Sequence, residues 1–159
     1  MAPVRTSLAV QALWLQRAFP EGTVRLQPSA LVWRAHVRPL PSAGTYLLEL
    51  RADGRTAPSI RVIDPDLVPD NHGRIPHVYE DGSICVAQAG DWRRSMLFVR
   101  TVVPWALEWL VFYEMWLATG IWMGDGDDRM DEASQAAILH PYSLSYADRE
   151  STQPRKDSA

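Results

Sequence analysis

The sequence has little of what several function classes require. It holds one cysteine, Cys85, so it cannot form an internal disulfide, which suits a protein of the reducing cytoplasm. Its formal net charge is −3, which gives no electrostatic reason to expect nucleic acid or an anionic membrane as the main partner. Its most apolar stretch, residues 97–117, is interrupted by Arg100, Glu108 and Glu114, whereas a membrane span needs about 20 mostly apolar residues. We therefore expect a cytoplasmic protein in which this stretch is a buried helix, and the mixed polar and apolar N-terminus predicts no signal peptide.

The sequence also has few residues in patterns that would bind a metal or a cofactor. The four histidines and the single cysteine contain no ligand pair at the spacing of a zinc site, so we expect neither a metal nor a cofactor. The run DGDD at residues 125–128 bears a weak likeness to a calcium loop, but it lacks the twelve-residue EF-hand spacing and its final glutamate.

The first half of the chain predicts one helix followed by strands. Residues 6–19 place Leu8, Ala12, Leu15 and Phe19 on one helical face, with Thr6 or Ser7 as the cap. Period-two alternation then predicts four half-buried antiparallel strands, and the short connections between them favour a meander. These strands are expected at residues 23–27, 31–38, 44–51 and 59–63.

The second half predicts a central segment, residues 75–92, followed by a core helix over 96–119. Trp105, Trp109, Phe112 and Trp116 recur at helical spacing, which we interpret as packing, and Gly120 is expected to end the helix. Pro104 lies either in the first turn or at a kink. We expect one domain over residues 1–146 with a last short helix at 131–139, and a polar, disordered tail over 147–159.

Cys85 lies where the predicted strands give way to the tryptophan-rich helix. Asp81-Gly82 just before it predicts a tight turn that would expose the thiol. The residues alone leave three interpretations open: an inert buried cysteine, a Cys–His hydrolase, or a transferase that carries an acyl group on the thiol. The hydrolase would pair the thiol with His72, His77 or His140.

Residues 75–86, IPHVYEDGSICV, resemble the active-site segment of ubiquitin-conjugating enzymes, and the similarity in element order extends over residues 6–119. The matching positions are Pro76, Tyr79, Gly82, Cys85 and the later Trp92. Two positions differ, since Ile75 replaces the family's histidine and His77 replaces its asparagine.

A bacterial branch of that family, associated with CBASS antiphage operons, resembles the chain at the asparagine position and in the helix that follows. Its members have histidine at the asparagine position and a helix like that of residues 103–124, which contains WLATGIW. The chain has no room for a fused activating domain, so it resembles the stand-alone form, and any activating enzyme would be a separate protein. The resemblance implies a role in priming a cyclic-oligonucleotide synthase by forming a bond to its C-terminus, and not general ubiquitin transfer.

The resemblance also implies an α+β ubiquitin-conjugating-like fold and a role for each site residue. Cys85 would be the nucleophile and thioester carrier, and His77 would stabilise the oxyanion or orient the loop. The carboxylate that positions the acceptor would be Asp125, Asp127 or Asp128, although these residues could equally be ordinary solvent-exposed charges. The residues that support the site structurally would be Pro76, Tyr79, Gly82 and Trp92. A cysteine hydrolase or deconjugase, and a catalytically silent binding module of the same fold, are the alternatives. The acyl donor, the final acceptor and the oligomeric state stay open.

Overall fold

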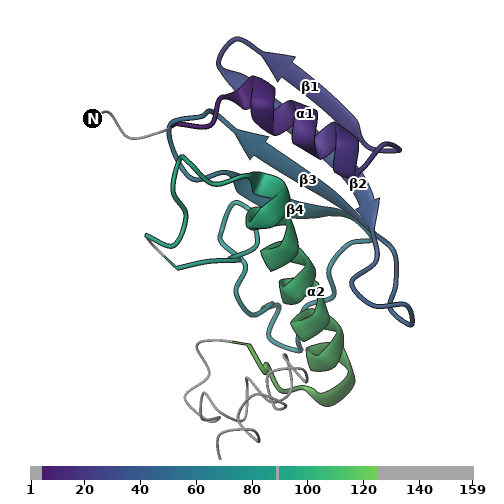
Figure 1. Cartoon of the computed structure of the whole chain (residues 1–159). Helices are drawn as coiled ribbons and strands as arrows, with labels where there is room; N and C mark the ends of the chain where they lie inside the picture. Colours follow the sequence, from purple (N-terminus) through teal and green to yellow (C-terminus); the bar gives the residue numbers. More distant parts are fainter. Residues whose placement is uncertain (1–4, 89, 125–159) are drawn as a thin grey trace, which may run out of the picture.

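The chain folds as an α+β structure in which a helix precedes a four-stranded sheet and a longer helix follows it (Figure 1). A computed structural model describes residues 5–88 and 90–124. The elements are α1 (Leu8–Ala18), β1 (Thr23–Gln27), β2 (Ala30–Val37), β3 (Tyr46–Ala52), β4 (Ser59–Asp64), the 3₁₀ turn η1 (Phe98–Arg100) and α2 (Val102–Thr119). The expected short helix at 131–139 and the expected tail at 147–159 lie outside the described residues.

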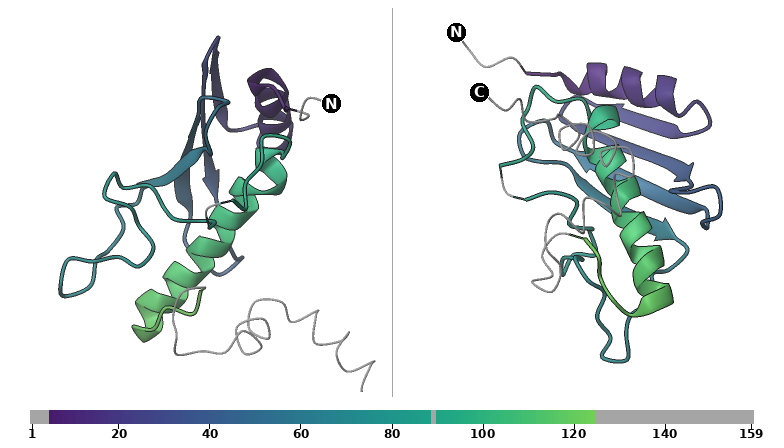
Figure 2. Two further views of the ribbon diagram at one scale, coloured as in Figure 1. Left: turned by 90° about the vertical axis from the view of Figure 1, so that its left-hand side faces the viewer. Right: turned by 60° about the horizontal axis from the view of Figure 1, so that its bottom comes forward.

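The sheet is the antiparallel meander that the sequence predicts, in the order β1-β2-β3-β4. Alternation sets its two faces: in β2, Leu31, Trp33, Ala35 and Val37 are buried, while the residues between them point the other way. Both helices lie on the same side of the sheet, as the left view of Figure 2 shows. The core therefore fills the space between the helices and the inner face, and the helices leave the outer face uncovered.

Helix α1 is fixed at its start and along its buried face. The Ser7 hydroxyl accepts a hydrogen bond from the Val10 N–H at 3.3 Å, which caps the helix. Gln11 is a buried polar residue of this helix, and its amide reaches the segment before α2: its Nε2 donates to the Met96 carbonyl at 2.8 Å, and its Oε1 accepts from the Phe98 N–H at 2.9 Å. This side chain thus ties the N-terminal helix to the chain that leads into α2.

Helix α2 begins at Val102, so the expectation of one continuous helix from residue 96 is wrong. Residues 98–100 form the 3₁₀ turn, and Thr101 has φ −132° and ψ −85°, outside the helical region. The Phe98 N–H bonds to Gln11, and the Phe98 side chain is buried, so this part of the chain serves the core instead of extending the helix. Pro104 lies in the first turn, where its missing N–H costs no hydrogen bond, and Gly120 ends the helix with φ 73°.

No helix within residues 5–88 and 90–124 is long and apolar enough to cross a membrane.

Candidate active site

Cys85 is the last residue of a small hairpin, residues 77–85, that is attached to the edge strand β4. The Cys85 N–H donates to the His77 carbonyl at 2.8 Å, and the Tyr79 N–H donates to the Ser83 carbonyl at 2.8 Å. The turn between them is closed by the Gly82 N–H on the Tyr79 carbonyl at 2.9 Å, and Gly82 has φ 82°, which confirms the tight turn predicted there. The Ile84 N–H donates to the Ile60 carbonyl at 2.8 Å. This last bond anchors the hairpin, and with it the thiol, to the sheet.

The turn is reinforced by the side chain of Asp81. Its Oδ1 accepts hydrogen bonds from the Ser83 hydroxyl at 2.5 Å and from the Ser83 N–H at 2.8 Å. These bonds hold the pKa of Asp81 below its ordinary value. A charged Asp81 therefore stabilises the turn that precedes Cys85, and with it the position of Cys85 relative to β4.

The Cys85 thiol is partly exposed and has a phenol beside it. The Tyr79 hydroxyl donates to Cys85 Sγ at 3.1 Å, and the sulfur lies 3.7 Å from the Ala87 carbonyl oxygen. Tyr79 itself is 55% exposed, and its hydroxyl contacts the Cys85 sulfur. The hydrogen bond to Cys85 and the charge of a Cys85 thiolate raise the pKa of Tyr79, which keeps its proton available for donation to the sulfur.

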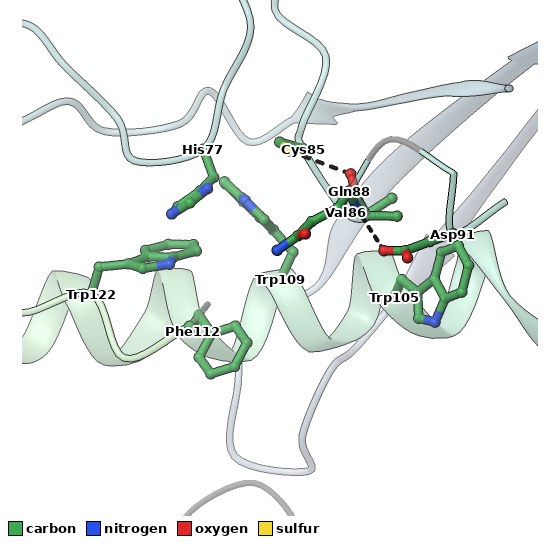
Figure 3. A pocket seen from close by; sticks show the side chains of 11 residues that line it. His77, Cys85, Val86, Gln88, Asp91, Trp105, Trp109, Phe112 and Trp122 are labelled. Carbon is green, nitrogen blue, oxygen red and sulfur yellow. Dashed lines mark hydrogen bonds between the residues drawn. The ribbon is translucent and has the colours of Figure 1, made fainter. Parts of the chain in front are cut away.

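His77 is held by its backbone and by an aromatic neighbour. Its φ is 54°, the left-handed region that few residues other than glycine adopt. Its ring lies 5.1 Å from the Trp122 ring, centroid to centroid, and Figure 3 shows it pointing toward Trp122 and not toward Cys85. In the described part of the chain no imidazole is hydrogen-bonded to the Cys85 sulfur. The Cys–His pair that a hydrolase needs is therefore not formed among these residues.

A cavity of about 450 Å³ opens beside the thiol (Figure 3). Its wall comes from the Cys85 loop, from the α2 side chains and from the segment after α2; it includes His77, Cys85, Val86, Ala87, Gln88, Asp91, Trp105, Trp109, Phe112, Trp122 and Gly124. Trp122 is buried against Trp109 and Phe112, with ring centroids at 5.6 and 5.7 Å. The tryptophan stripe that we interpreted as packing therefore also lines the site.

A second hollow of about 350 Å³ lies against the same loop on the Tyr79 side. Val86, Ala87, Gln88 and Trp105 line both hollows, and Tyr79 and Trp92 line this one. The loop after Cys85 thus lies between two hollows, of which only the first is lined by Cys85 itself.

A comparison with protein-family models decides the family. The model that describes the Type II CBASS E2 protein matches residues 11–129, which is most of the chain. The chain belongs to the Type II CBASS E2 family. Membership implies a conjugating-enzyme-like role in CBASS. A search of the curated proteins finds no match to this E2 protein.

The matched range of the CBASS E2 protein includes every residue to which the family resemblance gave a role. The structure brings His77, Tyr79, Gly82 and Cys85 together in one hairpin, while Trp92 packs beside Phe98 with ring centroids 6.3 Å apart. Pro76 directly precedes this hairpin and is partly buried. The candidate carboxylates Asp125, Asp127 and Asp128 lie outside the described residues.

Sequence reasoning missed two residues of the CBASS E2 cavity. Gln88 and Asp91 both line it, and the Gln88 N–H donates to Asp91 Oδ2 at 2.8 Å. The run QAGD holds an amide and an acid soon after the cysteine, which was the available signal. No group of three His, Cys, Asp or Glu side chains in the described ranges is placed to hold a metal ion.

Proposed function

We propose that this CBASS E2 protein carries an acyl group as a thioester on Cys85 and passes it to an amine. The observation that supports this best is the setting of the thiol: it is partly exposed, borders a cavity, and accepts a hydrogen bond from Tyr79. A thiolate attacks carbonyl carbon far faster than a thiol does, and a hydrogen bond from a neutral phenol favours the thiolate.

The first step joins the acyl group to the enzyme. The Cys85 thiolate attacks the carbonyl carbon of an activated carboxyl group, a C–S bond forms, and the activating group leaves with the electrons of its bond to that carbon. The developing oxyanion needs a hydrogen-bond donor. We assign this role to His77, which either donates to the oxyanion or holds the loop that does; its backbone carbonyl already positions the Cys85 N–H.

The second step transfers the acyl group to an amine. The amine nitrogen attacks the same carbon, the C–S bond breaks, sulfur leaves as a thiolate, and the amine gives up a proton. We propose Asp125, Asp127 or Asp128 as the carboxylate that positions or deprotonates the amine. Asp91 is a carboxylate that lines the cavity. Comparing the transfer rates of Asp91→Asn with those of the Asp125, Asp127 and Asp128 variants will identify the one that acts.

The acyl group that we propose is the C-terminus of the cyclic-oligonucleotide synthase of the same operon, which conjugation would prime. This choice rests on the CBASS family. Any activating enzyme would be a separate protein.

The test is adduct formation with that synthase and ATP, followed on non-reducing and reducing gels. We expect an adduct that dithiothreitol removes, that Cys85→Ala abolishes, and that Cys85→Ser converts to a thiol-resistant ester. His77→Ala should slow transfer about 10²–10³-fold if the imidazole donates to the oxyanion. A loss below threefold would exclude that role.

Two outcomes would contradict the transferase. Loss of an isopeptide-linked substrate without any adduct would assign the site to a deconjugase. Full biological activity of Cys85→Ala would assign the protein to a silent binding module.

A further inference from the structure

The outer face of the sheet has its own hollow, away from the Cys85 cavity. It measures about 410 Å³, and its lining comes from β1, β2 and β3: Thr23, Arg25, Gln27, Ala30, Val32, Arg34 and Arg51. We call this set the arginine hollow. It shares no lining residue with the cavity beside the thiol.

The strand register explains why these arginines meet. Arg25 pairs with Val32, and Val32 pairs with Arg51, so Arg25 and Arg51 flank one small apolar residue. In the next row Arg34 pairs with Glu49, and Glu49 pairs with Arg61. Side chains at paired positions lie on the same face of a sheet, so the four arginines converge on the outer face.

One carboxylate lies beneath these arginines. Glu49 is 2% exposed; its Oε2 lies 2.6 Å from an Arg34 terminal nitrogen, and its Oε1 lies 2.6 Å from Arg51 Nε. The three arginines of the hollow against this one carboxylate leave a formal charge of +2, on a chain whose net charge is −3. The hollow is therefore a local positive site on an acidic protein.

The arginines keep donors free for a second carboxylate. The side chains of Arg34 and Arg51 remain 49% and 58% exposed although both bind Glu49, and a guanidinium carries five N–H donors. Arg25 has no ion pair among the residues that the structure describes. Thr23 and Gln27 add neutral hydrogen-bonding groups at the rim.

The chemistry favours a polypeptide over nucleic acid. The only Phe, Tyr or Trp residues in the four strands are Trp33 and Tyr46, and both are buried on the inner face. Single-stranded nucleic acids are bound largely by stacking their bases on aromatic rings, which this face does not offer. The guanidinium groups of Arg34 and Arg51 already bind the Glu49 carboxylate here. The paired N–H donors of a guanidinium match the two oxygens of a carboxylate, so these groups are suited to bind further carboxylates.

We propose that the arginine hollow docks an acidic segment of a partner polypeptide through Arg25, Arg34 and Arg51. The docking does not depend on the thioester chemistry, because the two sites are built from different residues. It gives the protein a second contact surface whose strength depends on salt.

The test is fluorescence anisotropy of a labelled oligoglutamate peptide with the full chain. We expect binding that weakens as salt rises and that an oligoserine peptide of equal length does not show. Arg25→Ala should weaken binding about three- to tenfold, because charge-assisted hydrogen bonds to the peptide are lost. It should not disturb Glu49, which binds Arg34 and Arg51. Arg25→Ala combined with Arg51→Ala should weaken it further.

Two variants act as controls. Arg100→Ala removes an exposed arginine of the 3₁₀ turn η1, outside the hollow, and should bind the peptide as the unchanged protein does. Cys85→Ala should also bind normally, which separates this proposal from the thioester. The proposal is overturned if no peptide binding is found, if Arg100→Ala weakens binding as much as Arg25→Ala, or if a labelled oligothymidylate binds more tightly through the same arginines.

Discussion

At the scale of single residues, the contact between Tyr79 and Cys85 is central. The phenol donates to the sulfur at 3.1 Å, and its raised pKa keeps the phenol protonated. This arrangement differs from a Cys–His pair, because Tyr79 donates a hydrogen bond to the sulfur and does not take its proton. It suits the role that we propose for this sulfur, which is to accept an acyl group and later leave.

We predict that Tyr79→Phe slows alkylation of Cys85 by iodoacetamide at pH 7 about two- to tenfold. The phenol hydrogen bond stabilises the negative charge that the sulfur carries in the transition state of alkylation, and the loss of about 0.5–1.5 kcal/mol slows the reaction by that factor. Cys85 is the only cysteine, so the total rate of thiol loss measures this site alone. Tyr113→Phe serves as the control, since its hydroxyl bonds to the Val68 N–H and not to the sulfur. An unchanged or faster rate in Tyr79→Phe would show that the hydrogen bond does not assist the reaction of the sulfur.

A second prediction concerns the backbone of His77. Its φ of 54° costs an alanine about 1 kcal/mol, whereas asparagine adopts this region more readily. His77→Asn should therefore be more stable than His77→Ala by about that amount in urea unfolding. Both variants lose the ring that faces Trp122, so the difference isolates the backbone effect. Equal stabilities would mean that the loop relaxes out of the left-handed conformation.

At the scale of elements, the end of α2 shapes the site. After Gly120 the chain turns so that Trp122 packs on Trp109 and Phe112 and faces His77. Gly124 then passes over this cluster: a Cβ added there would lie 2.7 Å from Trp122 Nε1 and 2.9 Å from the Phe112 ring. The position therefore requires glycine for steric reasons.

Gly124→Ala should displace Trp122 and destabilise the protein by about 1–3 kcal/mol, the usual cost of overpacking. We expect a changed near-ultraviolet circular dichroism spectrum and a lower urea midpoint. Gly44→Ala is the matched control, because its added Cβ would meet atoms no closer than 3.5 Å. If the two variants have the same midpoint, the segment over Trp122 is not tightly packed.

Elements with a regular pattern were predictable, and contacts across the chain were not. Strand alternation and short connections predicted the meander and its order, and Asp81-Gly82 predicted the turn before Cys85. The start of α2 was misplaced because a residue of α1, Gln11, takes the Phe98 N–H. The Tyr79 contact depends on side-chain torsions around a turn, and the direction of the His77 ring depends on Trp122, far along the sequence. Neither contact produces a periodic pattern in the sequence from which it could be predicted.

At the scale of the whole molecule, the two faces of the sheet have different chemistry. The inner face and the helices enclose an apolar core and the tryptophan-lined cavity, while the outer face holds arginines around Glu49. Hydrogen bonds from Arg51, opposed by burial and aided by those from Arg34, hold the pKa of Glu49 below its ordinary 4.5. Glu49 thus joins β2 to β3 through Arg34 and Arg51 on the outer face.

This shift predicts how stability depends on pH. A carboxylate with a lowered pKa stabilises the fold above pH 4.5, and that contribution is lost as pH falls through its folded value. Glu49→Gln should therefore be less stable than the unchanged protein at pH 7, by about 1–3 kcal/mol. The gap should narrow below pH 4.5 in urea unfolding followed over a pH series. A gap that is constant with pH would show that the charge of Glu49 does not contribute.

The arginine hollow has one more consequence, which concerns reactivity. Every Lys or Arg in the described part of the chain is an arginine, and the sole lysine of the sequence is Lys156. A guanidinium keeps its proton at any physiological pH and so does not attack a thioester, whereas a lysine amine can. If Cys85 carries an acyl group as we propose, the arginine hollow would attract acidic partners without itself offering that group a competing amine.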